Sequence, residues 1–115
     1  MQVVFQITSE EESAKKAMLG QINNLLDYCM ENNKRIVVEV AVHGKAYGLL
    51  LQQENPLLEL VNSLAARSVR WMICKNTMKS HHIQETALPD YVVVIPSAVA
   101  HLVERQLNGW AYIKC

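Results

Sequence analysis

The chain has 115 residues, the size of one domain with one core, which leaves no room for a separate cofactor-binding domain. Hydrophobic residues make up 50% of the chain and charged residues 19%, which excludes a disordered protein. Eleven basic residues balance eleven acidic ones, so there is no net field to attract nucleic acid or an anionic membrane, and we expect neither as a partner.

The start of the chain does not resemble a targeting segment, because it has no basic region and its apolar run breaks at Gln6. Nowhere do about 18 consecutive apolar residues occur, as a membrane span would require. The cysteines Cys29, Cys74 and Cys115 form no CxxC pair, and their odd number argues against a disulfide framework. We therefore expect a cytoplasmic protein with reduced thiols.

The first predicted unit is a strand followed by a helix. Val3–Ile7 is a short apolar run, and Ser9 with Glu12 matches a capping box, which predicts the start of a helix. The helix should end at Asn32-Asn33. Apolar residues recur along it at intervals of three and four, which predicts a buried stripe: Ala14, Ala17, Met18, Ile22, Leu25, Leu26 and Cys29.

The second unit follows the same order. Ile36–Val42 is β-branched and nearly continuous in apolar residues, which is typical of a strand buried on both faces. Lys45–Leu51 is a plausible short helix, and Pro56 suits the first turn of another helix that runs to about Ala66. The buried stripe predicted for this helix consists of Leu57, Leu60, Val61 and Leu64.

The remaining chain predicts three more strands, at Arg70–Cys74, Tyr91–Ile95 and Trp110–Lys114. Helices are expected between them, at Asn76–His82 and Ser97–Leu107. Strands that alternate with helices, without two-residue hairpin turns, indicate an α/β fold with a mainly parallel sheet covered by helices on both faces. We expect residues 1–115 to form this single domain.

Ligands of such sheets bind at the carboxyl ends of the strands, where loops enter helices. That rule selects Thr8-Ser9, His43-Gly44, the segment Cys74–Thr77 and Pro96-Ser97. All four places should lie along one edge of the sheet.

Cys74 is the most informative residue at this edge. It ends a predicted strand just before a helix whose first N–H groups would stabilise a thiolate, and Lys75 and Lys79 add positive charge nearby. The thiolate is the nucleophilic form of cysteine. A small buried residue that only packs is an equally good interpretation at this stage.

The histidines do not indicate a metal site. The neighbours His81 and His82 would point in different directions, and His101 belongs to no HExxH or repeated Cys/His spacing, so we expect no metal. His43 precedes Gly44 at a strand end, where it is either a residue that orients a ligand or exchanges protons, or an exposed loop histidine.

Three common site motifs are absent. Gly44-Lys45 does not complete a phosphate loop, because Glu39 stands where that pattern needs glycine. No GxGxxG segment indicates a dinucleotide, and Ser97 lacks the G-x-S-x-G surroundings of a hydrolase nucleophile. We therefore expect no cofactor.

Several segments resemble one family. They are Val42–Gly44 followed by Leu49–Leu51, Met72–Met78, Leu88-Pro89, Val94–Gln106 and Gly109–Lys114. Together they resemble the small DsrE/DsrF-like proteins of the sulfur-relay superfamily, over essentially the whole chain. The resemblance implies a three-layer α/β/α fold with a five-stranded, mainly parallel sheet, and a homo-oligomer, either a trimer or a hexamer.

The resemblance also implies a chemistry. Characterised relatives carry sulfur as a cysteine persulfide between a donor and an acceptor protein, and the matching cysteine is Cys74. By this analogy the N–H groups of Asn76 and Thr77 would stabilise the anionic sulfur, and Lys75 would favour ionisation.

Two other functions stay open. One is a noncatalytic oligomeric module that binds a small anion or metabolite in a strand-end pocket around His43, Cys74, Asn76 and Ser97. The other is a thiol–disulfide oxidoreductase, in which Cys115 of the same or a neighbouring subunit would resolve a disulfide with Cys74.

Overall fold

The computed structural model describes residues 1–115. Its elements are β1 (Gln2–Ile7), α1 (Glu12–Glu31), β2 (Val37–Val42), the 3₁₀ helix η1 (Gly44–Leu50), α2 (Leu58–Ala66), β3 (Arg70–Cys74), α3 (Lys75–Ser80), the 3₁₀ helix η2 (Glu85–Ala87), β4 (Val93–Ile95), α4 (Ala98–Leu107) and β5 (Ala111–Lys114). Every predicted strand is present. The short helix expected at Lys45–Leu51 is the 3₁₀ helix η1.

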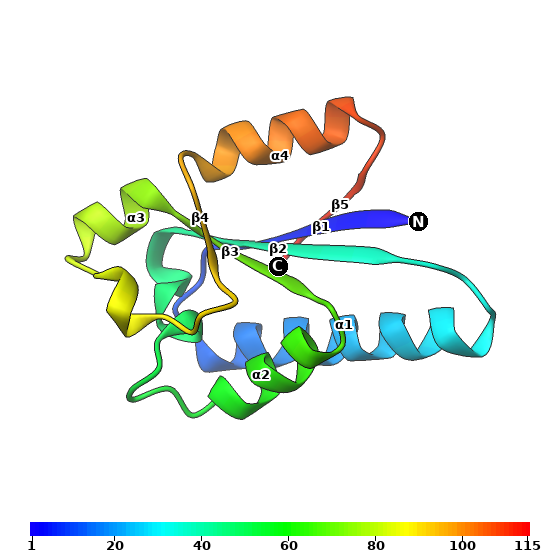
Figure 1. The fold of residues 1–115 in the computed structure, drawn as a ribbon, viewed down its shortest axis with the longest axis horizontal. Coiled ribbons are helices and arrows are strands. Elements are labelled where there is room, and N and C mark those ends of the chain that lie inside the picture. Colours follow the sequence, from blue (N-terminus) through cyan, green and yellow to red (C-terminus); the bar gives the residue numbers. More distant parts are fainter.

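The five strands form one sheet in the order β4-β3-β2-β1-β5, and all four pairings are parallel. Helices α1 and α2 cover one face and α4 covers the other, which gives three layers (Figure 1). The fold is thus the predicted α/β/α architecture, with a sheet that is entirely parallel.

The two faces of the sheet are covered unequally. A cluster of 20 buried residues fills the space between the sheet and α1, η1 and α2. On the opposite face α4 buries only Ala98 and Leu102, in two clusters of four residues each. Strand β2 is central and buried on both faces, as its apolar run predicts, yet its middle residue on the α4 side is the charged Glu39.

Three local predictions were wrong. The first concerns the buried stripe of α1, in which Ala17 is exposed and Leu19, which the predicted stripe did not include, is buried.

The other two concern a helix start and a second buried stripe. Helix α1 begins at Glu12 with Glu11 as its N-cap, so no capping box forms, and the Ser9 hydroxyl instead accepts a hydrogen bond from the Glu11 N–H at 3.1 Å. In α2 the side chain of Leu60 is exposed, because this short helix needs only Val61 and Leu64 to reach the core.

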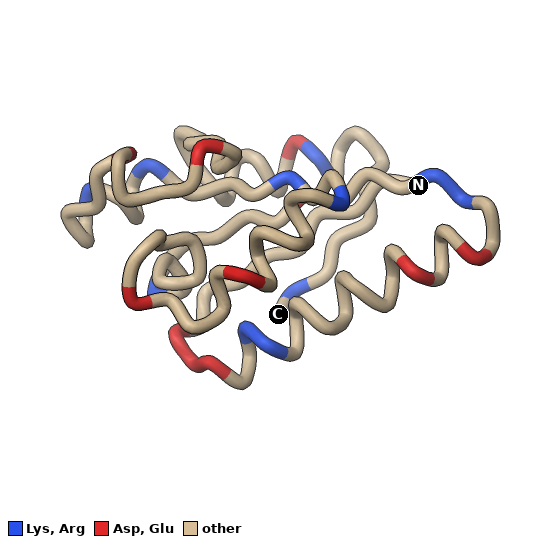
Figure 2. Tube along the Cα trace, turned by 60° about the horizontal axis from the view of Figure 1, so that its bottom comes forward, with Lys and Arg blue, Asp and Glu red and all other residues tan.

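Basic and acidic residues are interspersed along the trace rather than gathered by sign (Figure 2). None of the helices combines the length and the apolar character needed to cross a membrane.

Candidate functional site

The structure places Cys74 at the junction between strand and helix that its sequence position predicts. It is the last residue of β3 and the N-cap residue of α3. Strand alternation turns Met72 and Cys74 to the same face of the sheet, where both pack with Ile95 and Ala98 beneath the first turn of α4. Two helices therefore begin beside this one side chain.

This environment favours the thiolate. Burial raises the pKa of Cys74, but hydrogen bonding from the backbone N–H groups of Ala98, Thr77 and Asn76 and from the Thr77 hydroxyl lowers it by more, so the pKa lies below the ordinary value of 9.0. Asn76 and Thr77 are the two residues whose N–H groups were expected to stabilise an anionic sulfur. Lysine is not among the groups that lower the pKa, so the role expected for Lys75 finds no support here.

Gly44 and Thr77 connect the ends of β2 and β3. The Gly44 N–H donates to the Thr77 hydroxyl oxygen at 3.0 Å, which leaves the hydroxyl proton free to point at Cys74. Gly44 has a φ of +60°, a backbone conformation that side chains other than glycine rarely adopt. Gly44 therefore serves this site by positioning the Thr77 hydroxyl.

His43 lies next to Cys74 along the sheet, because the β2–β3 register pairs Val42 with Ile73 just before them. Gln6 connects His43 to Tyr112. The Gln6 Oε1 atom accepts a hydrogen bond from the Tyr112 hydroxyl, and the Gln6 Nε2 atom lies 2.8 Å from His43 Nε2. Since the amide nitrogen only donates, His43 Nε2 accepts, which makes the ring neutral. Burial also lowers the pKa of His43, which favours the neutral ring as well.

Gln6 and Tyr112 were not predicted as site residues. Gln6 had a detectable signal, because it is a polar side chain between the apolar residues Phe5 and Ile7 of β1. Tyr112 had no such signal, because its contact with Gln6 depends on the pairing of β5, the last strand, with β1, the first.

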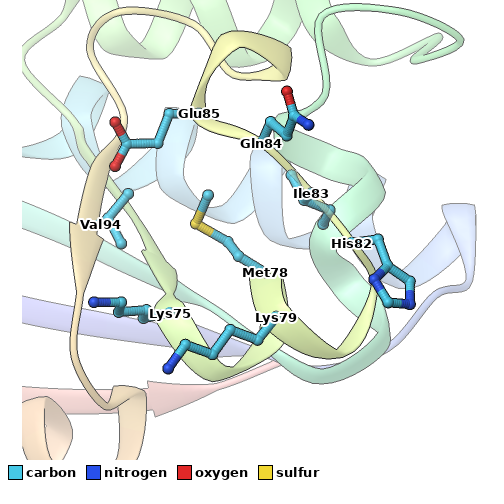
Figure 3. A pocket seen from close by; sticks show the side chains of 8 residues that line it. All are labelled: Lys75, Met78, Lys79, His82, Ile83, Gln84, Glu85 and Val94. Atoms are coloured by element: carbon cyan, nitrogen blue, oxygen red, sulfur yellow. The ribbon is translucent and has the colours of Figure 1, made fainter.

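The Ser97 hydroxyl oxygen accepts the Ala100 N–H at 3.1 Å, so this side chain caps α4. Of the predicted site residues, Lys75 alone lines a neighbouring open cavity of about 400 Å³. Its lining residues are Lys75, Met78, Lys79, His82, Ile83, Gln84, Glu85 and Val94 (Figure 3). His43, Cys74, Asn76 and Ser97 are absent from this lining, so the predicted pocket around them is not the cavity found here.

The other cysteines have different surroundings. Cys29 is buried in the core, as predicted. Cys115 follows β5, three strand positions from β3, which is about 14 Å across a sheet. It packs on the α1 side, where its sulfur donates to Gln21 Oε1 at 3.7 Å. A disulfide needs Cα atoms within about 7 Å, so Cys115 cannot resolve Cys74 within one chain.

The pH dependence of alkylation should distinguish these thiols. The thiolate is the reactive form, so Cys74, with its lowered pKa, should reach half-maximal reaction with iodoacetamide below pH 9.0. Burial raises the pKa of Cys115, so its midpoint should lie above that of Cys74. Peptide mapping after short pulses at each pH measures both sites in one sample. The reverse order of midpoints would contradict the described environment of Cys74.

No group of three or more His, Cys, Asp or Glu side chains is placed to hold a metal ion. The strand ends bring together one thiol, the N–H groups that favour its thiolate, and a neutral imidazole.

Three solved structures share this fold over nearly their whole lengths. A protein of unknown function from Methanobacterium thermoautotrophicum superposes with a TM-score of 0.89 at 29% identity, covering 99% of this chain and 98% of its own. The ychN protein from E. coli gives 0.77 at 13% identity, covering 100% and 99%. A conserved protein of unknown function from Bacteroides thetaiotaomicron gives 0.74 at 10% identity, covering 99% and 94%.

No curated protein matches the chain significantly. The model of one protein family, described as the DsrE/DsrF-like family, matches residues 1–115. Because the family model matches the whole chain, this protein belongs to the DsrE/DsrF-like family.

Proposed function

We propose that this protein is a cytoplasmic sulfur carrier that holds a persulfide on Cys74. The observation that carries the proposal is the position of Cys74, where N–H groups from α3 and α4 and the Thr77 hydroxyl favour its thiolate. Membership of a family linked to sulfur relay supplies the kind of cargo. A reducing compartment would keep the free thiol available.

The chemistry requires no external oxidant. The Cys74 thiolate attacks the outer sulfur of a donor persulfide, R–S–SH, and the donor leaves as the thiolate R–S⁻. The product is Cys74–S–SH, with the transferred sulfur as its outer atom. An acceptor thiolate then attacks that outer sulfur and releases the Cys74 thiolate.

The surroundings of Cys74 suit transfer of a single atom. The residue is only 6% exposed, so broad contact with a substrate is impossible at the sulfur itself. His43 lies beside Cys74 and is neutral, because its Nε2 accepts from the Gln6 amide. It therefore forms no ion pair with a persulfide anion that would oppose release of the sulfur.

Intact-protein mass spectrometry after exposure to cysteine persulfide tests the proposal. One added sulfur atom should appear on the Cys74 peptide and disappear on reduction. No adduct under conditions that convert a known carrier would favour the noncatalytic anion-binding module instead.

We also propose that the carrier is a homo-oligomer, a trimer or a hexamer, in which a second copy covers α4. Val99, Val103 and Leu107 recur every four residues along α4 and are 61%, 50% and 81% exposed. Such a continuous apolar stripe on one helix is the usual mark of a helix-to-helix contact. A net charge of zero adds no repulsion between copies.

Light scattering should give the wild-type protein a mass of three or six times 13.0 kDa. The double variant Val103→Glu/Leu107→Glu should shift to the monomer at micromolar concentration, because two carboxylates would be desolvated at the contact. Met30→Glu, an equally exposed change on α1, is the matched control and should keep the oligomer. A monomeric wild type would refute the assembly.

A further inference from the structure

A buried ion-pair cluster lies on the α4 face of the sheet, away from Cys74. Glu39, in the middle of β2, has no exposed surface. Its Oε1 accepts from His101 Nε2 at 2.7 Å and from Arg105 Nε at 2.9 Å, and its Oε2 accepts from Arg105 Nη2 at 2.8 Å. Arg70 of β3 adds a longer contact of 3.7 Å to Oε2.

The cluster is a principal attachment of α4 to the sheet. The helix buries only Ala98 and Leu102, while the apolar residues Val99, Val103 and Leu107 face away from the sheet. Apolar contact alone therefore fixes the position of α4 weakly. Three charge-assisted hydrogen bonds, two of them from one planar guanidinium, fix both its register and its rotation.

The same helix contributes to the cysteine site through its other end. Ala98, the first residue of α4, packs against Cys74, and its N–H is one of the groups that favour the thiolate. His101 and Arg105 follow three and seven residues later, about one and two helical turns along. A helix of ten residues moves nearly as a unit, so a shift of its second half also moves its first turn.

We propose that Glu39, through His101 and Arg105, holds α4 in the position that places the Ala98 N–H against the Cys74 sulfur. Glu39 is then a positioning residue that sets the reactivity of the carrier cysteine from the middle of β2. The inference refines the proposed sulfur-carrier function and gives the otherwise costly burial of a carboxylate a role at that site.

Glu39→Gln separates positioning from simple electrostatics because the two effects have opposite signs. Loss of a negative charge, by itself, favours a nearby thiolate and would lower the pH at which Cys74 becomes reactive. Loosening of α4 withdraws the Ala98 N–H and would raise that pH. The direction of the change therefore identifies its cause.

The experiment is the pH profile of Cys74 alkylation by iodoacetamide, read by peptide mapping. For Glu39→Gln we expect the midpoint to rise by roughly one pH unit, the effect of losing most of one hydrogen bond to a charged group. Asp27→Asn is the matched control: it also removes a carboxylate that pairs with arginine, but between α1 and α2 on the opposite face. Its midpoint should equal that of the wild type.

A second variant covers the case in which Glu39→Gln does not fold. Arg105→Lys keeps the net charge and changes a side chain that is 30% exposed, while it loses the two-point contact with Glu39. It should raise the Cys74 midpoint by a smaller amount. An unchanged or lowered midpoint in the folded variants, or an equal rise in Asp27→Asn, overturns the inference.

These outcomes are independent of sulfur transfer, because the pH midpoint of alkylation reports the ionisation of Cys74 and involves no sulfur donor. A raised midpoint in Glu39→Gln together with no persulfide on the wild type would uphold the positioning role and reject the carrier function. Persulfide on the wild type with an unchanged midpoint in Glu39→Gln would do the reverse.

Discussion

Replacement of Cys74 by serine is expected to reduce sulfur uptake to the background of the donor alone. A hydroxyl at this position stays protonated near neutral pH and cannot form the sulfur–sulfur bond that holds the cargo. The fold should persist, since serine is nearly isosteric with cysteine and only one thiol among the buried residues Met72, Ile95 and Ala98 changes. Mass spectrometry of the variant after cysteine persulfide treatment measures the effect.

Cys115→Ser is the matched control for that substitution. Cys115 lies on the opposite face of the sheet, beyond the reach of Cys74 within the chain. The control should retain one added sulfur on Cys74. If sulfur uptake survived in Cys74→Ser but disappeared in Cys115→Ser, the sulfur would be bound to Cys115, and the proposed mechanism would be wrong.

The largest effect on stability is expected from Arg105→Ala. This change removes two of the three short hydrogen bonds to a carboxylate without exposed surface, and also the contact of the guanidinium with the Trp110 ring, 4.5 Å away. Breaking a buried pair in this way costs about 3 kcal/mol, near the lower end of the usual range because His101 and Arg70 still face Glu39. Urea unfolding monitored by circular dichroism measures the loss.

Arg67→Ala is the control for Arg105→Ala. Arg67 pairs with Asp27 at 2.9 Å, but the Asp27 side chain is 45% exposed, so its loss should cost less than about 1 kcal/mol. An equal loss in the free energy of unfolding for the two variants would show that the buried pair with Glu39 stabilises the fold no more than the exposed pair with Asp27.

The contribution of Glu39 should also depend on pH. Burial raises its pKa, but hydrogen bonds and charge from Arg105 and His101 lower it by more, so the folded-state pKa lies below the ordinary 4.5. A carboxyl with a depressed pKa stabilises the folded chain fully above that ordinary value, and the stabilisation is lost as the pH falls through the folded-state pKa. The difference in stability between wild type and Arg105→Ala should therefore shrink in acid.

The architecture could be predicted from the sequence because each strand and helix has a local pattern of residue types. β-branched runs such as Val37–Val42 and the alternation of strands with helices specify a parallel, helix-covered sheet without knowledge of any contact. The same local logic placed Cys74 at the end of a strand and the start of a helix. The capping box failed because the Ser9 hydroxyl accepts the N–H of Glu11, only two residues later, and the helix begins at Glu12.

The tertiary structure decided what surrounds the cysteine. The Ala98 N–H comes from a helix that begins 24 residues after Cys74, and Tyr112 reaches Gln6 only because β5 adds beside β1 rather than beside β4. The sequence marked Glu39 as one charge in a buried strand, but its partners His101 and Arg105 lie more than 60 residues away. Local patterns determine where strands and helices form; the sheet order and the docking of α4 determine which side chains meet, and that depends on contacts between distant segments.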